Sequence, residues 1–71
     1  GVRHEMERLI GWHEDRLASY RAIEARDFSG PNMTRGQRLQ HRVLLKGISA
    51  EEDWLQWARG TLPLLSEPAH A

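Results

Sequence analysis

The feature that most constrains the fold is a long apolar stripe over residues 39–62. Its apolar positions are separated mainly by three, four or seven residues, which is the period of a helix with one broad buried face. They are Leu39, Val43, Leu44, Leu45, Ile48, Trp54, Leu55, Trp57, Ala58 and Leu62. Two tryptophans and several leucines on one face are more apolar surface than a lone helix can expose to water. The stripe therefore predicts a helix that packs against a partner.

A second helical pattern occupies residues 3–28, where apolar positions again advance by threes and fours. They are Met6, Leu9, Ile10, Leu17, Tyr20, Ile23 and Phe28, with His13 on the same face. Trp12 falls off this face, so it either widens the buried surface or marks a second contact surface. Three charge pairs would border the helix, namely Arg3–Glu7, Glu5–Arg8 and Arg21–Glu24. Each is worth only about 0.2–0.5 kcal/mol, so packing must hold the helix.

The segment between the two patterns predicts a tight connection. Gly30 is expected to adopt a left-handed conformation as a C-terminal cap, and Pro31 cannot continue the helix. Thr34 and Gln37 have the spacing of a capping box, which marks the start of the second helix. A linker of about five residues favours antiparallel neighbours, so we expect a helical hairpin.

Because of Gly47, the sequence allows two predictions for the second helix. The helix either breaks near residues 47–49, where Ser49 and Glu52 form another possible capping box, or continues over residues 34–62. We favour the continuous helix because the stripe keeps its phase across Gly47. Since an interior glycine costs about 1 kcal/mol relative to alanine, we expect another backbone to approach it closely. Residues 63–71, which include Pro63 and Pro68, are predicted to be irregular.

Size and charge narrow the functional classes. A chain of 71 residues forms one small domain whose single core is marginal, and without cysteine it has no disulfide to compensate. Self-association is then a common remedy. Ten basic and ten acidic residues give zero net charge, which argues against a nucleic-acid or membrane surface. The start at Gly1 suggests a fragment or processed piece, and the absence of cysteine and of a signal peptide fits a cytoplasmic location.

Catalytic and metal sites are not expected. His4, His13, His41 and His70 lack metal-ligand spacing, and no cofactor is implied. His13 is better explained as a half-buried, hydrogen-bonded imidazole. Glu51, Glu52 and Asp53 are adjacent, so their side chains diverge and are expected to form a solvated face. No nucleophile, base and orienting group can be assembled, so an enzyme serves only as a contrast to the other hypotheses.

The aromatic residues raise a second functional hypothesis. Trp12, Tyr20, Trp54 and Trp57 could line a pocket for a flat apolar effector. Packing anchors at an interface are the alternative, because tryptophan and tyrosine are enriched at interface centres.

Several of these residues together resemble a known family. Leu44-Leu45-Lys46-Gly47-Ile48, then Trp54-Leu55, then Leu62, with Leu17 and Tyr20 upstream, resemble the C-terminal domain of PadR-family transcriptional regulators, of the kind found in virulence-gene activators. In that family an N-terminal winged helix binds DNA, and the C-terminal helices form the dimer that spaces the two DNA readers. The resemblance implies the dimer role for Leu17, Tyr20, Gly47, Trp54 and Leu55, with DNA bound by a domain outside these 71 residues.

Together these observations predict an all-α fold, an antiparallel hairpin of two long helices that dimerises into a four-helix arrangement. The shared core would comprise Leu9, Ile10, Leu17, Tyr20, Ile23, Val43, Gly47, Trp54, Leu55 and Ala58. The predicted function is homodimerisation, and effector sensing by the aromatic cluster is the alternative.

Overall fold

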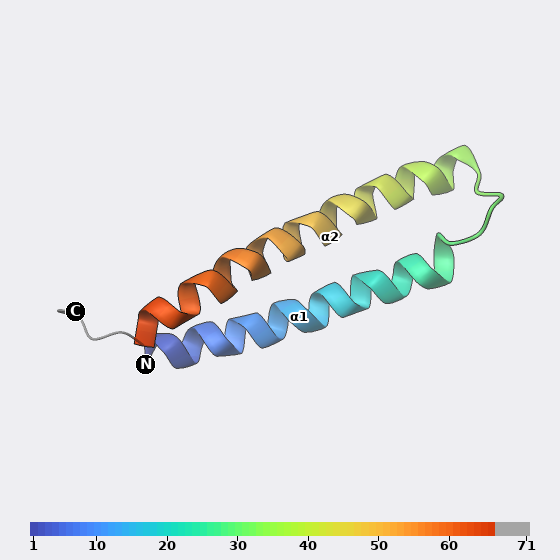
Figure 1. Cartoon of the computed structure of the whole chain (residues 1–71). Helices are drawn as coiled ribbons and strands as arrows, with labels where there is room; N and C mark the ends of the chain where they lie inside the picture. The colour runs from blue at the N-terminus through green and yellow to red at the C-terminus, as the bar shows by residue number, and fades with distance from the viewer. Residues whose placement is uncertain (67–71) are drawn as a thin grey trace.

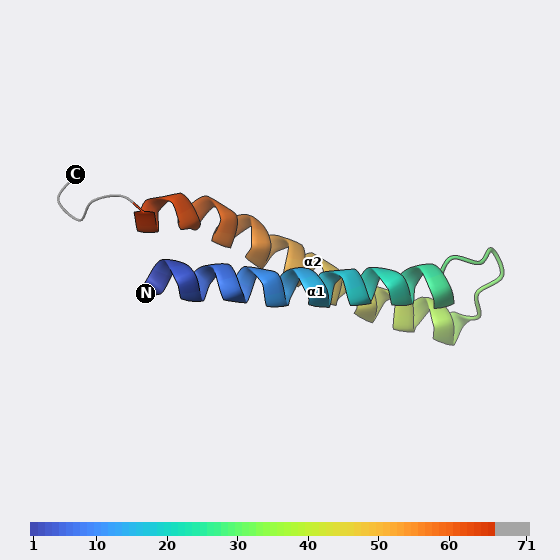
Figure 2. The same cartoon turned by 90° about the horizontal axis from the view of Figure 1, so that it is seen from below.

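The computed structural model describes residues 1–66 as two long helices, α1 (Val2–Asp27) and α2 (Arg35–Thr61), followed by a short 3₁₀ helix, η1 (Leu62–Ser66). The helices lie side by side and run in opposite directions, with the connecting turn at one end (Figure 1). Seen from below, α2 crosses α1 (Figure 2). The predicted all-α hairpin is confirmed, whereas pairing with a second copy stays a prediction.

The contact between the helices follows a repeat of seven residues on each side, the spacing of coiled-coil packing. On α2 the inward positions are Leu44, Ile48, Glu51, Leu55, Ala58 and, at its end, Leu62. On α1 they are Met6, Ile10, His13, Leu17 and Tyr20. Ile10, Leu55 and Ala58 form the core cluster, with Leu55 1% and Ala58 0% exposed. The hairpin thus buries residues that the sequence assigns to a core shared between two chains.

The second helix begins where its capping box predicts. The Thr34 hydroxyl accepts a hydrogen bond from the Gln37 backbone at 3.1 Å, and the Gln37 side chain accepts one from the Thr34 backbone at 2.8 Å. Two otherwise unpaired amide groups are satisfied in this way. Helix α2 then continues without a break through Gly47 to Thr61. Ser49 is therefore an interior helix residue and not a cap.

The end of α1 differs from the prediction for Gly30. No described residue has a positive φ, so Gly30 is not a left-handed cap. The chain leaves the helix at Phe28, with φ of −131°, and the Ser29 hydroxyl donates to the Ala25 carbonyl at 2.7 Å. The Phe28 ring stacks on His41 of α2, with ring centroids 5.3 Å apart. This contact between the helices directs the chain before it reaches Gly30.

Charge pairs and the tail are partly as predicted. The predicted ion pairs Arg3–Glu7 and Arg8–Glu5 are present, each with a nitrogen to oxygen distance of 2.7 Å. Arg21, however, bonds to Glu52 across the hairpin at 2.7 Å, and Glu24 bonds to His41, also at 2.7 Å. The predicted pair between Arg21 and Glu24 is therefore wrong, because each residue finds a partner on the other helix.

Residues 62–66 form η1 where an irregular tail was expected. Residues 67–71, with Pro68 and His70, lie outside the described residues.

Gly47 has a packing reason, but its neighbour is a side chain and not the predicted backbone. A Cβ placed on Gly47 would lie 3.2 Å from Cε2 of the Tyr20 ring. Gly11, inside α1, has nothing within 4 Å of the same position. The glycine therefore lets the Tyr20 ring lie against the backbone of α2.

This difference between the two glycines is testable. Gly11→Ala should raise the free energy of unfolding by up to about 1 kcal/mol, because alanine is the better helix former. Gly47→Ala should raise the free energy of unfolding clearly less than Gly11→Ala, or lower it, because the new Cβ would crowd the Tyr20 ring. Chemical denaturation at one fixed protein concentration measures both. In a Tyr20→Ala background Gly47→Ala should stabilise as Gly11→Ala does. Equal gains with Tyr20 present would contradict the contact.

Candidate functional site

A buried polar cluster lies in the middle of the hairpin. Glu51 of α2 is only 7% exposed, and its Oε2 lies 2.5 Å from Nδ1 of His13 on α1. Its other oxygen lies 3.4 Å from Nε of Arg16. The expectation of a half-buried, hydrogen-bonded His13 is confirmed, since 17% of its side chain is exposed. The expectation that Glu51 is solvated is wrong, because residue 51 shares the inward face of α2 with Ile48 and Leu55.

Arg16 joins this cluster to the aromatic residues. Its Nε donates to the Tyr20 hydroxyl at 3.0 Å, and this hydrogen bond raises the pKa of the Arg16 guanidinium. The guanidinium carbon lies 5.0 Å from the Trp12 ring centroid and 5.9 Å from that of Tyr20. Both distances suit cation–π attraction. One cation therefore orients two aromatic rings and a buried carboxylate.

Two tryptophans contact the imidazole of His13, and the third lies beside one of them. His13 stacks on Trp54 at 3.8 Å and contacts Trp12 edge-on at 4.9 Å. The Trp57 ring lies beside Trp54, with the two ring centroids 6.1 Å apart. Trp12 and Trp57 remain 55% and 57% exposed. The hairpin therefore gathers indole rings on one side without covering them.

The aromatic residues predicted to line a pocket are only partly brought together. An open depression on α2 is lined by Ala50, Asp53, Trp54 and Trp57. Trp12 and Tyr20 do not line it. Tyr20 lies instead against Gly47 and under Arg16. The depression therefore brings together two of the four aromatic residues, Trp54 and Trp57.

One uncharged row of residues on α2 remains partly uncovered beside the inward face. We call it the open stripe: Val43, Gly47, Ala50, Trp54, Trp57 and Thr61. Alternating steps of four and three place its members on one side of the helix. Val43 is 74% exposed, Ala50 is also exposed, and Trp54 is half-buried. On α1, Leu9 and Trp12 are exposed as well.

The ten residues predicted for the shared core therefore occupy different places. Ile10, Leu55 and Ala58 are buried within the hairpin, and Leu17 and Trp54 pack against them. Tyr20, Ile23 and Gly47 are half-buried, and Leu9 and Val43 are exposed. Only the exposed and half-buried members have surface left for a partner.

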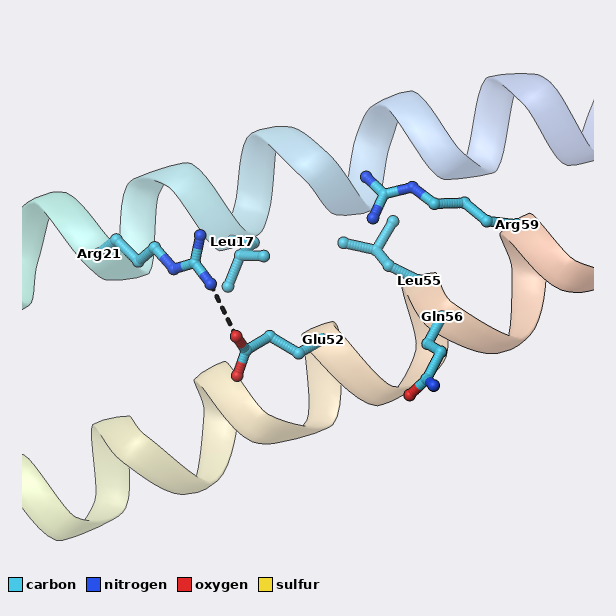
Figure 3. Close-up of a pocket in the computed structure, with 6 residues that line it drawn as sticks. All are labelled: Leu17, Arg21, Glu52, Leu55, Gln56 and Arg59. Carbon is cyan, nitrogen blue, oxygen red and sulfur yellow. Dashed lines mark hydrogen bonds and ion pairs between the residues drawn. The ribbon is translucent and has the colours of Figure 1, made fainter.

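The other side of the hairpin is charged and internally paired. A shallow groove there is lined by Leu17, Arg21, Glu52, Leu55, Gln56 and Arg59. In Figure 3 the Arg21 guanidinium points to Glu52, Leu17 and Leu55 point toward one another, and Gln56 points away from α1. Arg59 bonds to Glu14 at 2.8 Å. The two sides thus differ in chemistry, one charged and the other aromatic.

Within residues 1–66 no group of three or more histidine, cysteine or acidic side chains is arranged to hold a metal ion. Neither long helix combines the length and apolar character that crossing a bilayer requires.

Comparison with known families agrees with this architecture. Residues 1–66 match the family model described as virulence activator alpha C-term, the C-terminal domain of PadR-like regulators. The chain belongs to this family. Neither a curated protein nor a solved structure matches it. Membership in a regulator family implies that the virulence activator domain is not an enzyme.

Sequence reasoning missed Glu51 and Arg16 as members of the central cluster of the virulence activator domain. Glu51 stands seven residues after Leu44 and seven before Ala58, so strict counting of the repeat would have placed it inward. Arg16 lies off the inward face of α1, and no comparable signal identifies it. Its place depends on Tyr20 and Trp12 in the folded hairpin.

Removing His13 should destabilise the virulence activator domain strongly. His13→Ala removes the hydrogen bond to the buried Glu51 and leaves Arg16 as its only other neighbour, and a buried polar group that loses its partner costs about 1–3 kcal/mol. His41→Ala is the matched control, because its partner Glu24 is more exposed, with 34% of its side chain accessible. That change also removes the stacking on Phe28 and should still cost clearly less than His13→Ala. Denaturant midpoints compare the two variants, and equal losses would rule out a special role for the central cluster.

Proposed function

We propose that this domain is the homodimerisation module of a PadR-like regulator. In this proposal the dimer fixes the distance between DNA-binding winged helices that lie outside the 71 residues, in a cytoplasmic protein. The observation that carries the proposal is the open stripe, in which Val43, Ala50 and Trp57 stay exposed after the hairpin has formed. Belonging to a regulator's C-terminal domain family supports it.

The energetic argument starts from the small size of the hairpin core. Ile10, Ile48, Leu55 and Ala58 are its buried apolar residues, in a body of only 57 × 15 × 14 Å. Such a core is marginal for a chain of this length. Covering the exposed half of one indole ring removes on the order of 100 Å² from water, or about 2.5 kcal/mol. Trp12 and Trp57 each offer that gain to a partner.

Charge explains why the partner is a second copy. The open stripe carries no charged side chain, so two copies can meet along it without pairing like charges inside the contact. A two-fold interface requires a surface that complements itself, which an uncharged stripe allows. On the opposite side the charged groups are already paired with one another, as Arg21–Glu52 and Arg59–Glu14. The interface therefore involves the exposed and half-buried members of the predicted set, including Leu9, Val43, Gly47 and Trp54, and adds Trp12 and Trp57.

A charge placed in the open stripe should dissociate the dimer. Trp57→Glu would bury a carboxylate in the contact, and we expect at least a tenfold higher dissociation constant, about 1.4 kcal/mol. Gln56→Glu adds the same charge one residue away, on the side shown in Figure 3, and should leave the constant unchanged. Sedimentation over a concentration series measures both. A wild-type chain that remains a folded monomer at high micromolar concentration would refute the proposal.

Effector sensing is a second candidate, favoured by the depression lined by Ala50, Asp53, Trp54 and Trp57. Two indole rings beside a carboxylate could hold a planar ligand. Titration with planar aromatic compounds should then quench or shift tryptophan emission, and Trp57→Ala should reduce the response. No change at millimolar ligand would leave only the interaction role.

A further inference from the structure

The basic residues of the described chain fall into two groups. Six arginines each contact a carboxylate, in the pairs Arg3–Glu7, Arg8–Glu5, Arg16–Glu51, Arg21–Glu52, Arg26–Asp27 and Arg59–Glu14. The other four form no ion pair among residues 1–66. They are Arg35, Arg38, Arg42 and Lys46, and they follow one another along the first three turns of α2. We call them the basic row.

The basic row lies on one side of α2. Its steps of three, four and four residues keep its members on one face, over about 16 Å at 1.5 Å per residue. All four are exposed. No acidic residue occurs in α2 before Glu51, so the first turns that carry the row have no compensating charge of their own, and only at its far end does Asp53 line a depression with Lys46. The zero net charge of the chain conceals this local excess, because its acids are concentrated elsewhere.

Two further features add to the positive potential at this end of the hairpin, near the connecting turn in Figure 1. The row begins at the N-terminus of α2, where the helix dipole favours an anion. Arg38 also donates from Nη1 to the Met33 carbonyl at 3.0 Å, which orients its guanidinium. A shallow groove lined by Arg42, Leu45, Lys46 and Ser49 continues the row by one turn and offers a hydroxyl as a further donor.

We propose that the basic row binds phosphates of the backbone of duplex DNA. Three of its four members are arginines, whose planar guanidinium suits two-point contact with phosphate. A membrane surface fits less well, because no tryptophan, tyrosine or phenylalanine lies on this part of α2 to enter a bilayer. The inference rests on the proposed function for its biological setting, since a regulator's dimer would hold these ends near DNA.

The basic row and the open stripe can act at the same time. Residues 35, 38, 42 and 46 lie about a quarter turn around α2 from residues 43, 47, 50 and 54, at 3.6 residues per turn. Lys46 borders the open stripe, since it lines one depression together with Ala50. Dimerisation along the open stripe therefore leaves the three arginines of the basic row accessible. In a dimer two such rows would be present, and contacts to phosphate would position the regulator without reading bases.

Binding of a labelled DNA duplex of arbitrary sequence by the 71-residue chain tests the proposal. Fluorescence anisotropy should show binding at 50 mM salt that weakens about 100-fold by 200 mM, as expected for about four phosphate contacts. Changing all four basic-row residues to Gln should weaken binding at 50 mM salt at least tenfold and flatten the salt dependence.

The matched control changes Arg3, Arg8, Arg21 and Arg59 to Gln, which removes the same charge from paired positions. It should retain the salt dependence of the wild type, and circular dichroism should confirm that both variants are helical. Equal losses in the two variants, or no wild-type binding at 50 mM salt, would overturn the proposal. So would equally tight binding to polyglutamate, which would assign the row to an acidic protein.

Sedimentation of the same samples separates this proposal from dimerisation. A dimer that does not bind DNA would overturn the role of the basic row and leave the open stripe in place. A monomer that binds DNA through the basic row would overturn the proposed dimer and leave the role of the basic row in place.

Discussion

The structure depends on the antiparallel contact between two helices that each present one residue in every three or four to the other. Ile10, Leu55 and Ala58 form the dry part of this contact, and Ala58 is small enough for the helices to approach closely. One end is set by the Thr34 capping box, and the other by Leu62, which packs on the core cluster. Everything else on the hairpin is placed relative to this contact.

The polar centre of the contact favours the observed register. In this register Glu51 faces His13 and Arg16, whereas a slide by one heptad would move the carboxylate away from both groups. The same register brings Trp54 onto the imidazole and so gathers Trp12 and Trp57 on one side. The buried polar cluster and the exposed aromatic side are therefore two results of one alignment.

A hairpin with this alignment has three distinct surfaces. One side is charged and self-paired through Arg21–Glu52 and Arg59–Glu14. A second is the uncharged open stripe, the proposed site of a second copy. The third is the basic row near the turn, the proposed site of a polyanion. A small domain can serve several partners because a long helix offers different chemistry around its circumference.

Much of the fold was predictable from local sequence. The two helices, the capping box of Thr34 and Gln37, and the antiparallel hairpin follow from periodicity and turn chemistry, which act over a few residues. The turn was less predictable, because the stacking of Phe28 on His41 joins residues that sequence reasoning treats separately. For the same reason Arg21 was assigned a partner on its own helix, while in the hairpin it bonds to Glu52.

The sequence by itself determined that this chain forms two amphipathic helices with an excess of apolar surface. Only the tertiary structure decided which part of that surface is used inside the hairpin. Leu55 and Ala58 are covered by α1, whereas Val43 and Trp57 are left exposed, although all four belong to the same broad stripe. Periodicity defines a face on one helix, but the register and crossing of two helices divide that face into buried and open halves. Those features depend on long-range contacts such as Glu51 with His13, which no local pattern encodes.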